Sequence, residues 1–227
     1  QDTLVSAGFT VKYYRAADVT VELYRQLPSL GFRLIVLRVH SGATYQGGVY
    51  PFTSEPYDEH RYTLEQLTGS LKKASVSGTE PYYFAISPTF VDTNMQGNFR
   101  GAIIVLSSCN GLVSTSLADP LIRRGASAVV SWDGPVTLDH TDKATEILLK
   151  ALAERSTVSE AVQAAMDKVG PDPEYVSNLR YYPLESDHVT LWTITSVRLN
   201  ERNQILCQIV QQKPVLRLHC SRTPAHL

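Results

Sequence analysis

Two short apolar runs, residues 34–39 (LIVLRV) and residues 102–106 (AIIVL), constrain the fold of this chain more than any other feature. Each run is nearly continuous instead of alternating with polar residues, which is typical of a strand buried on both faces of a parallel sheet. Parallel strands need crossover connections, and helical patterns lie between the apolar runs. We therefore predict an α/β fold with a mainly parallel central sheet and helices on both faces.

Other segments continue the alternation of strands and helices. The clearest helix signal is a capping box, Thr157 and Glu160, ahead of an apolar face in residues 158–169. Further strands are expected at residues 9–14, 81–91 and 127–132, helices at 19–27, 64–74, 112–124 and 144–152, and a loop or hairpin at 45–62. Residues 188–197, 205–210 and 215–220 are predicted to be strands, the last two forming a hairpin that adds antiparallel strands at an edge of the sheet.

Composition places the chain among globular proteins and excludes some classes of function. The 227 residues include 21 Lys plus Arg and 22 Asp plus Glu, a formal net charge of −1 that gives no electrostatic footprint for nucleic acid. The longest uncharged run, residues 101–118, is too polar for a membrane span. We expect a single domain over residues 1–227, cytoplasmic, without direct binding to nucleic acid or membrane. The start at Gln1 suggests an excised or processed chain.

Chemically useful residues follow both apolar runs. The first run ends at His40-Ser41-Gly42 and the second at Ser107-Ser108-Cys109-Asn110-Gly111. If the two strands are parallel neighbours, His40 and Cys109 emerge at the same edge, where a histidine can deprotonate a thiol whose pKa is otherwise about 8.5. The backbone amides of Ser41, Gly42 and Cys109 could then form an oxyanion hole. The alternative is a structural cysteine, because cysteine is among the most buried residue types.

The segments IIVLSSCNGL, LADPLIRRGASAVVSWDGPV and TDKATEILLKALAERSTVSEAVQAAM resemble the caspase-like (clan CD) cysteine peptidases, and most of all their CHAT domains, with separase and gingipain-like peptidases as relatives. The resemblance covers residues 30–195, is most specific over 103–166, and leaves 198–227 as a C-terminal β extension. It implies a three-layer caspase-like sandwich, with Cys109 as the nucleophile and His40 as its partner. Two departures are Ser41 between the histidine and Gly42, and a long interval in which residues 43–80 form an insertion.

Members of this clan read the substrate residue before the scissile bond, P1, in a pocket near the strand that follows the cysteine. Here the matching positions offer Ser107, Trp132, Asp133 and Glu146, with Asp139 and Asp142 as further carboxylates. A desolvated carboxylate would select arginine or lysine, and Asp133 and Glu146 are the leading candidates. Asp139 and Asp142 could instead serve the start of a helix.

The sequence thus predicts a cysteine endopeptidase that acts on a protein or peptide substrate with a His40/Cys109 dyad, with a preference for a basic P1 residue and gating by a regulatory domain or partner. CHAT relatives act in bacterial defence or regulated cell death. No metal or other cofactor is expected, because neither a ligand cluster nor a phosphate-binding motif is present. The alternatives are a non-catalytic interaction or scaffold domain and, less favoured, a nucleotide-binding α/β domain.

Overall fold

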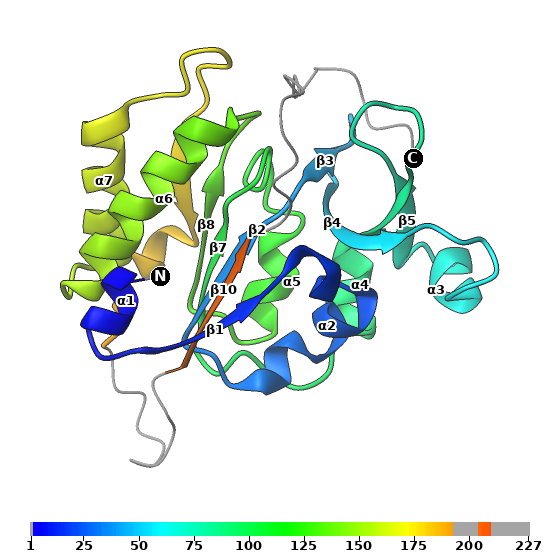
Figure 1. Cartoon of the computed structure of the whole chain (residues 1–227), viewed down its shortest axis with the longest axis horizontal. Helices are drawn as coiled ribbons and strands as arrows, with labels where there is room; N and C mark the ends of the chain where they lie inside the picture. The colour runs from blue at the N-terminus through cyan, green and yellow to red at the C-terminus, as the bar shows by residue number, and fades with distance from the viewer. Residues whose placement is uncertain (1, 193–203, 210–227) are drawn as a thin grey trace.

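A six-stranded sheet forms the centre of the molecule (Figure 1). The structure, a computed structural model, describes residues 2–192 and the backbone of residues 204–209. The strands lie in the order β1 (Thr10–Tyr14), β10 (Gln204–Ile209), β2 (Leu34–Arg38), β7 (Ile103–Leu106), β8 (Ala128–Trp132) and β9 (Leu179–Tyr182). All neighbouring pairs are parallel except β8 and β9, which are antiparallel. The fold is therefore mixed α/β with a largely parallel sheet.

The two apolar runs are β2 and β7, and they pair directly, with Leu34 opposite Ile103 and Leu37 opposite Leu106. Side chains along each strand alternate between two hydrophobic clusters, one on each face of the sheet. Leu34 and Val36 enter one cluster, and the residues between and after them enter the other. Burial on both faces explains why neither strand shows polar alternation.

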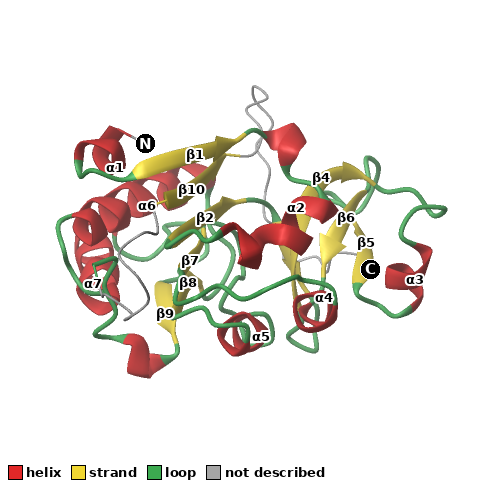
Figure 2. Ribbon diagram, turned by 90° about the horizontal axis from the view of Figure 1, so that it is seen from below, coloured by secondary structure: helices red, strands yellow, loops and turns green. Residues whose placement is uncertain are grey.

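Helices cover both faces of the sheet, as Figure 2 shows from below. One face is covered by α1 (Asp2–Ser6), α6 (Leu138–Ala153) and α7 (Val158–Val169). The hydrophobic cluster on the other face includes residues of α2 (Val21–Gln26), α4 (Pro88–Thr93) and α5 (Ala118–Arg123). Three 3₁₀ turns complete these layers: η1 (Ala16–Asp18), η2 (Leu27–Leu30) and η3 (Leu184–Ser186). The predicted capping box starts α7: Thr157 Oγ1 accepts from the Glu160 amide at 3.2 Å, and Glu160 Oε2 accepts from the Thr157 amide at 2.8 Å.

A second, four-stranded antiparallel sheet stands beside the main one (Figure 1). Its order is β3 (Ser41–Ala43), β4 (Val49–Pro56), β6 (Tyr83–Ile86) and β5 (Leu71–Ala74), with the short helix α3 (Thr63–Leu67) between β4 and β5. The amide of Ser54 donates to the Val19 carbonyl at 2.8 Å, and the buried Glu55 accepts from the Val21 amide at 3.1 Å. The segment expected as an insertion, residues 43–80, thus supplies β4, α3 and β5 of this small sheet, and β4 is bonded to Val19 and to the start of α2.

Three predicted elements have different bounds in the structure. The helix expected at 64–74 ends at Leu67, because Gly69 adopts a φ of +72° and the chain then enters β5. The strand expected at 81–91 ends at Ile86, since Ser87 caps α4 by accepting from the Phe90 amide at 3.2 Å. The helix expected at 112–124 begins only at Ala118.

The prediction for the C-terminal strands was wrong in one respect. β10 lies inside the sheet, parallel to both β1 and β2, and does not extend an edge as an antiparallel strand. The antiparallel edge strand is β9, which the sequence pattern did not reveal. Residues 188–192 are not a strand, whereas 193–197 and the predicted partner strand 215–220 lie outside the described residues. Local periodicity predicts a strand, but its neighbours depend on a long connection that periodicity does not encode.

Candidate functional site

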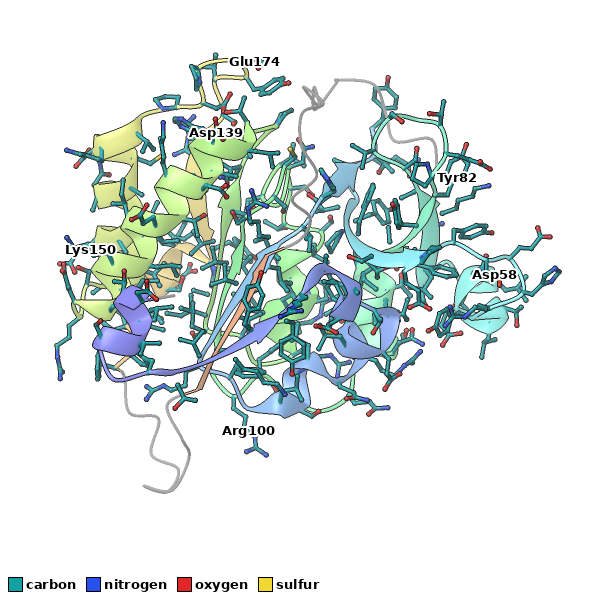
Figure 3. All side chains as sticks on the ribbon, in the orientation of Figure 1. Asp58, Tyr82, Arg100, Asp139, Lys150 and Glu174 are labelled. Atoms are coloured by element: carbon teal, nitrogen blue, oxygen red, sulfur yellow. The ribbon has the colours of Figure 1, made fainter. Side chains whose placement is uncertain are left out.

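The candidate site lies where β2 and β7 end, at the same edge of the main sheet. Their parallel pairing continues past β7, because the Ser107 amide donates to the Leu37 carbonyl at 2.9 Å. Two residues further on, the Ser41 hydroxyl donates to the Cys109 carbonyl. In Figure 3, Asp139 at the start of α6 and the nearby Glu174 mark the end of the molecule at which β2 and β7 finish. Arg100, which lies just before β7, marks the opposite end of the molecule. The chain segments that carry His40 and Cys109 are therefore neighbours.

The pairing register also predicts that the two side chains share a face. The last pair of the register is Leu37 with Leu106, and a further three residues in the same register would set His40 opposite Cys109. Cys109 belongs to the cluster under α6 and α7, together with Val36 and Val105. Alternation continued for two residues past Arg38 would bring His40 to that same face. The imidazole of His40 lies 6.3 Å, centroid to centroid, from the ring of Phe52 on β4.

The electrostatic surroundings of His40 favour its neutral form. Burial lowers the pKa of the imidazole below 6.5, and the positive charge of Arg38 lowers it further. Arg38 is held in place by Asp142 of α6, whose two carboxylate oxygens accept from Nε and a terminal guanidinium nitrogen at 2.6 and 2.7 Å. His40 is therefore available as a proton acceptor at neutral pH.

Cys109 is buried, with 8 % of its surface exposed. Its sulfur lies 3.5 Å from the Val136 carbonyl oxygen, which a reduced thiol can use as an acceptor. In the structure Cys109 is disulfide-bonded. Nucleophilic chemistry at this position requires the reduced form, since only a thiol can give the thiolate.

The loop after the cysteine is tightly constrained. Asn110 has a φ of +59°, and a Cβ added to Gly111 would lie 2.0 Å from the Ser131 hydroxyl oxygen. That hydroxyl donates to the Leu106 carbonyl at 2.6 Å, so it cannot move away without losing a buried hydrogen bond. Glycine at position 111 thus permits the close approach of this loop to β8.

The amides of Ser41 and Gly42, both expected to bind an oxyanion, point to opposite sides of β3, the strand that pairs with β4 in a hairpin. The Phe52 amide donates to the His40 carbonyl at 2.8 Å, and the Thr44 amide to the Gly48 carbonyl at 2.9 Å. Gly42 lies midway and faces Tyr50, so the alternation of the antiparallel ladder directs its amide into the hairpin. The Ser41 amide points to the other side, which favours Ser41 and Cys109 as the donors.

Ser107 and Trp132, expected to line a P1 pocket, lie in the interface between the sheet and α6. Trp132 is fully buried, and its indole Nε1 donates to Thr141 Oγ1 at 2.9 Å. The Ser107 hydroxyl lies 3.0 Å from those of both Thr141 and Thr145. These contacts give both residues a structural role under α6.

The expected carboxylates differ in their partners and exposure. Asp133 accepts from the Asn178 amide at 2.7 Å and from Arg180 Nε at 3.1 Å. Asp142 is bound to Arg38, while Asp139 and Glu146 are exposed on α6. Asp133 thus has its partners on β9 and the segment before it, whereas Asp139, Asp142 and Glu146 lie along α6.

The sequence analysis missed the pairing of Arg38 with Asp142. Its signal was present, because Arg38 is the one charged residue within the run LIVLRV, and a charge at the end of a buried strand needs a partner. Asp172 was also missed. It lies between two prolines, a pattern that indicates only a turn.

Within residues 2–192 no helix has the length and apolarity needed to cross a bilayer. The described side chains include no group of three or more His, Cys, Asp or Glu arranged to hold a metal ion. No protein-family model matches the chain, and no curated protein matches it significantly.

Proposed function

We propose that the chain is a cysteine endopeptidase in which His40 and Cys109 form the catalytic dyad. The observation that carries the proposal is the parallel register of β2 and β7, whose last pair, Leu37 and Leu106, lies three residues before His40 and Cys109. The carboxyl end of a parallel sheet is also where α/β enzymes bind their substrates. A largely parallel sheet with helices on both faces supports the finer assignment to a three-layer caspase-like sandwich.

In the proposed reaction, neutral His40 takes the proton of the reduced Cys109 thiol, and the sulfur attacks the carbonyl carbon of the scissile peptide bond. The amides of Ser41 and Cys109 bind the oxyanion that develops. The imidazolium then gives its proton to the leaving amine as the C–N bond breaks and an acyl-enzyme forms. Water, deprotonated by His40, hydrolyses the thioester and restores the thiol.

The substrate proposal remains a protein or peptide with a basic P1 residue. Asp133 is engaged by Arg180, which leaves Asp139 and Glu146 on α6 as the candidate carboxylates; both are exposed, so a bound substrate would have to desolvate them. The burial of Cys109 supports gating by a regulatory domain or partner, and its disulfide adds a requirement for reduction.

The same two observations favour a second candidate, a non-catalytic interaction or scaffold domain in which Cys109 is structural. The two candidates differ in whether the reactivity of the thiol depends on His40. A structural thiol reacts slowly with an electrophile and is insensitive to replacement of the histidine.

The test is cleavage of a P1-diverse fluorogenic peptide library by the whole chain after reduction with dithiothreitol, with and without calcium. Cys109→Ala and His40→Gln are the test variants, and His60→Gln, which alters a highly exposed histidine, is the matched control. We expect cleavage by the wild type and by His60→Gln and its loss in the other two.

Selective alkylation of Cys109 provides a second readout, followed by mass spectrometry of the tryptic peptide 101–123. A reduced wild type that cleaves nothing, and whose Cys109 alkylation is unchanged by His40→Gln, would overturn the peptidase and leave the scaffold candidate.

A further inference from the structure

A five-residue segment, residues 133–137, lies between the loop that carries Cys109 and the connection from α7 to β9. We call it the backing segment, and we call residues 109–112 the cysteine loop. The backing segment begins where β8 ends and stops at Thr137, the N-cap of α6. It includes Val136, whose carbonyl oxygen contacts the Cys109 sulfur.

Backbone hydrogen bonds attach the cysteine loop to β8 and to the backing segment. The Asn110 amide donates to the Gly134 carbonyl at 2.8 Å, and the Leu112 amide donates to the Trp132 carbonyl at 2.9 Å. Together with the sulfur contact at Val136, these bonds make the position of Cys109 depend on the conformation of residues 132–136.

The other side of the backing segment is held by residues 172–178, which we call the clamp loop. The Asp133 amide donates to the Asn178 carbonyl at 3.0 Å, and the Asn178 amide returns a bond to the Asp133 carboxylate. The Ser177 hydroxyl donates to the Pro135 carbonyl. Gly134 lies so close to this loop that an added Cβ would be 3.0 Å from the Ser177 Cβ.

Asp172 joins the clamp loop to the end of the backing segment. Only 1 % of its surface is exposed. One carboxylate oxygen accepts from the amide and hydroxyl of Thr137 at 2.8 and 2.9 Å, and the other accepts from the amides of Glu174 and Tyr175 at 3.0 and 2.9 Å. Every bond uses the carboxylate as an acceptor, so an amide side chain cannot reproduce the set.

We propose that Asp172 is a positioning residue for Cys109, acting through the backing segment. The proposal rests on the proposed peptidase function. Its chain of contacts runs from Asp172 to Thr137, along the backing segment to Gly134 and Val136, and from these to the cysteine loop. Burial raises the pKa of Asp172, but the hydrogen bonds from Thr137, Tyr175 and Glu174 outweigh it and lower the pKa overall, in keeping with a permanently ionised anchor.

The central test is Asp172→Asn, which keeps the size of the side chain but turns an acceptor oxygen into a donor group. Asp187→Asn is the matched control, because Asp187 is exposed and its side chain bonds only its neighbour His188 among the described contacts. In the reduced chain we expect Asp172→Asn to lower kcat about 10- to 100-fold with KM little changed, as misplacement of a reacting group does. Asp187→Asn should behave as wild type.

A second pair of variants separates positioning from general destabilisation. Thr137→Val removes the hydroxyl that donates to Asp172, whereas Thr137→Ser keeps it. The serine variant should retain kcat and the valine variant should lose part of it, both measured below their unfolding transitions. Equal kcat in the two variants would contradict the proposed role of this hydrogen bond.

Hydrogen exchange of the peptide spanning 107–113 tests the coupling without any assay of activity. The amides of Asn110 and Leu112 should exchange faster in Asp172→Asn than in wild type or Asp187→Asn. Unchanged exchange and unchanged kcat overturn the positioning role while the peptidase stands. If the wild type has no peptidase activity, the proposed function is overturned. The catalytic role of Asp172 is then overturned as well, even if the exchange of the Asn110 and Leu112 amides changes as expected.

Discussion

Arg38 and Asp142, which are 104 positions apart in the sequence, form a two-bond ion pair between the end of β2 and the second turn of α6. The pair fixes a positive charge two residues before His40, and that charge contributes to the lowered pKa of the imidazole. Burial is the larger cause of the lowered pKa, and Arg38, held by Asp142, adds to it. The ion pair therefore joins β2 to α6 and also holds the positive charge that lowers the pKa of His40.

Replacing Arg38 should move the pH dependence of catalysis. In Arg38→Gln the pKa of His40 rises towards 6.5, because the repulsion by the guanidinium is gone and only burial still lowers it. The acidic limb of the pH profile of kcat/KM, where His40 must be neutral, therefore shifts to higher pH. Asp142→Asn removes the negative charge that pairs with Arg38 and should shift the limb the opposite way. Shifts of the same sign in both variants would contradict this account.

The titration of His40 should also appear in the stability of the protein. Because its pKa is lower in the folded chain than the unfolded value of 6.5, the unfolded state binds more protons as the pH falls through 6.5. The free energy of unfolding should therefore decrease from neutral pH down to the folded pKa and then show no further change from this group. Urea titrations between pH 7.5 and about 5 measure this loss, and His40→Gln should show a smaller one than His60→Gln.

The burial of β2 and β7 on both faces of the sheet was predictable because an unbroken apolar run is typical of a doubly covered strand. The start of α7 was predictable because a capping box is a local interaction between Thr157 and Glu160. Both features are encoded within short segments. The proposed dyad followed from the same strands, since residues after parallel neighbours share an edge.

The features that were not predictable depend on contacts between distant segments. β10 lies inside the main sheet, and β9 forms an antiparallel edge. The order and direction of strands in a sheet depend on the path of the connections between them, and the periodicity of a strand does not encode that path. The acidic P1 pocket was inferred from carboxylates close in sequence. Two of those carboxylates are engaged by arginines on other strands, Arg38 on β2 and Arg180 on β9. Partners at such separations become visible only in the folded chain.

The hydroxyl network under α6 should contribute measurably to stability. In Thr141→Val the indole of Trp132 loses its acceptor in a fully buried position, and Ser107 keeps only Thr145. An orphaned buried donor costs about 1–3 kcal/mol in free energy of unfolding. Thr79→Val, in an exposed turn, is the control and should change stability little. Denaturant titration measures both, and a loss of equal size in the two variants would contradict a specific role for the network.

The close approach of Gly111 to Ser131 gives the sharpest test of the cysteine loop. In Gly111→Ala the new methyl group meets the Ser131 hydroxyl oxygen at 2.0 Å and its Cβ at 2.7 Å, and both are held by the bond to Leu106. We expect the free energy of unfolding to fall by about 1–3 kcal/mol, as overpacking does. Ser131→Gly removes both obstructing atoms, so the double variant should lose less than the sum of the single changes. Additive losses would mean that the methyl group is accommodated elsewhere, and that the loop after Cys109 is not shaped by its contact with β8.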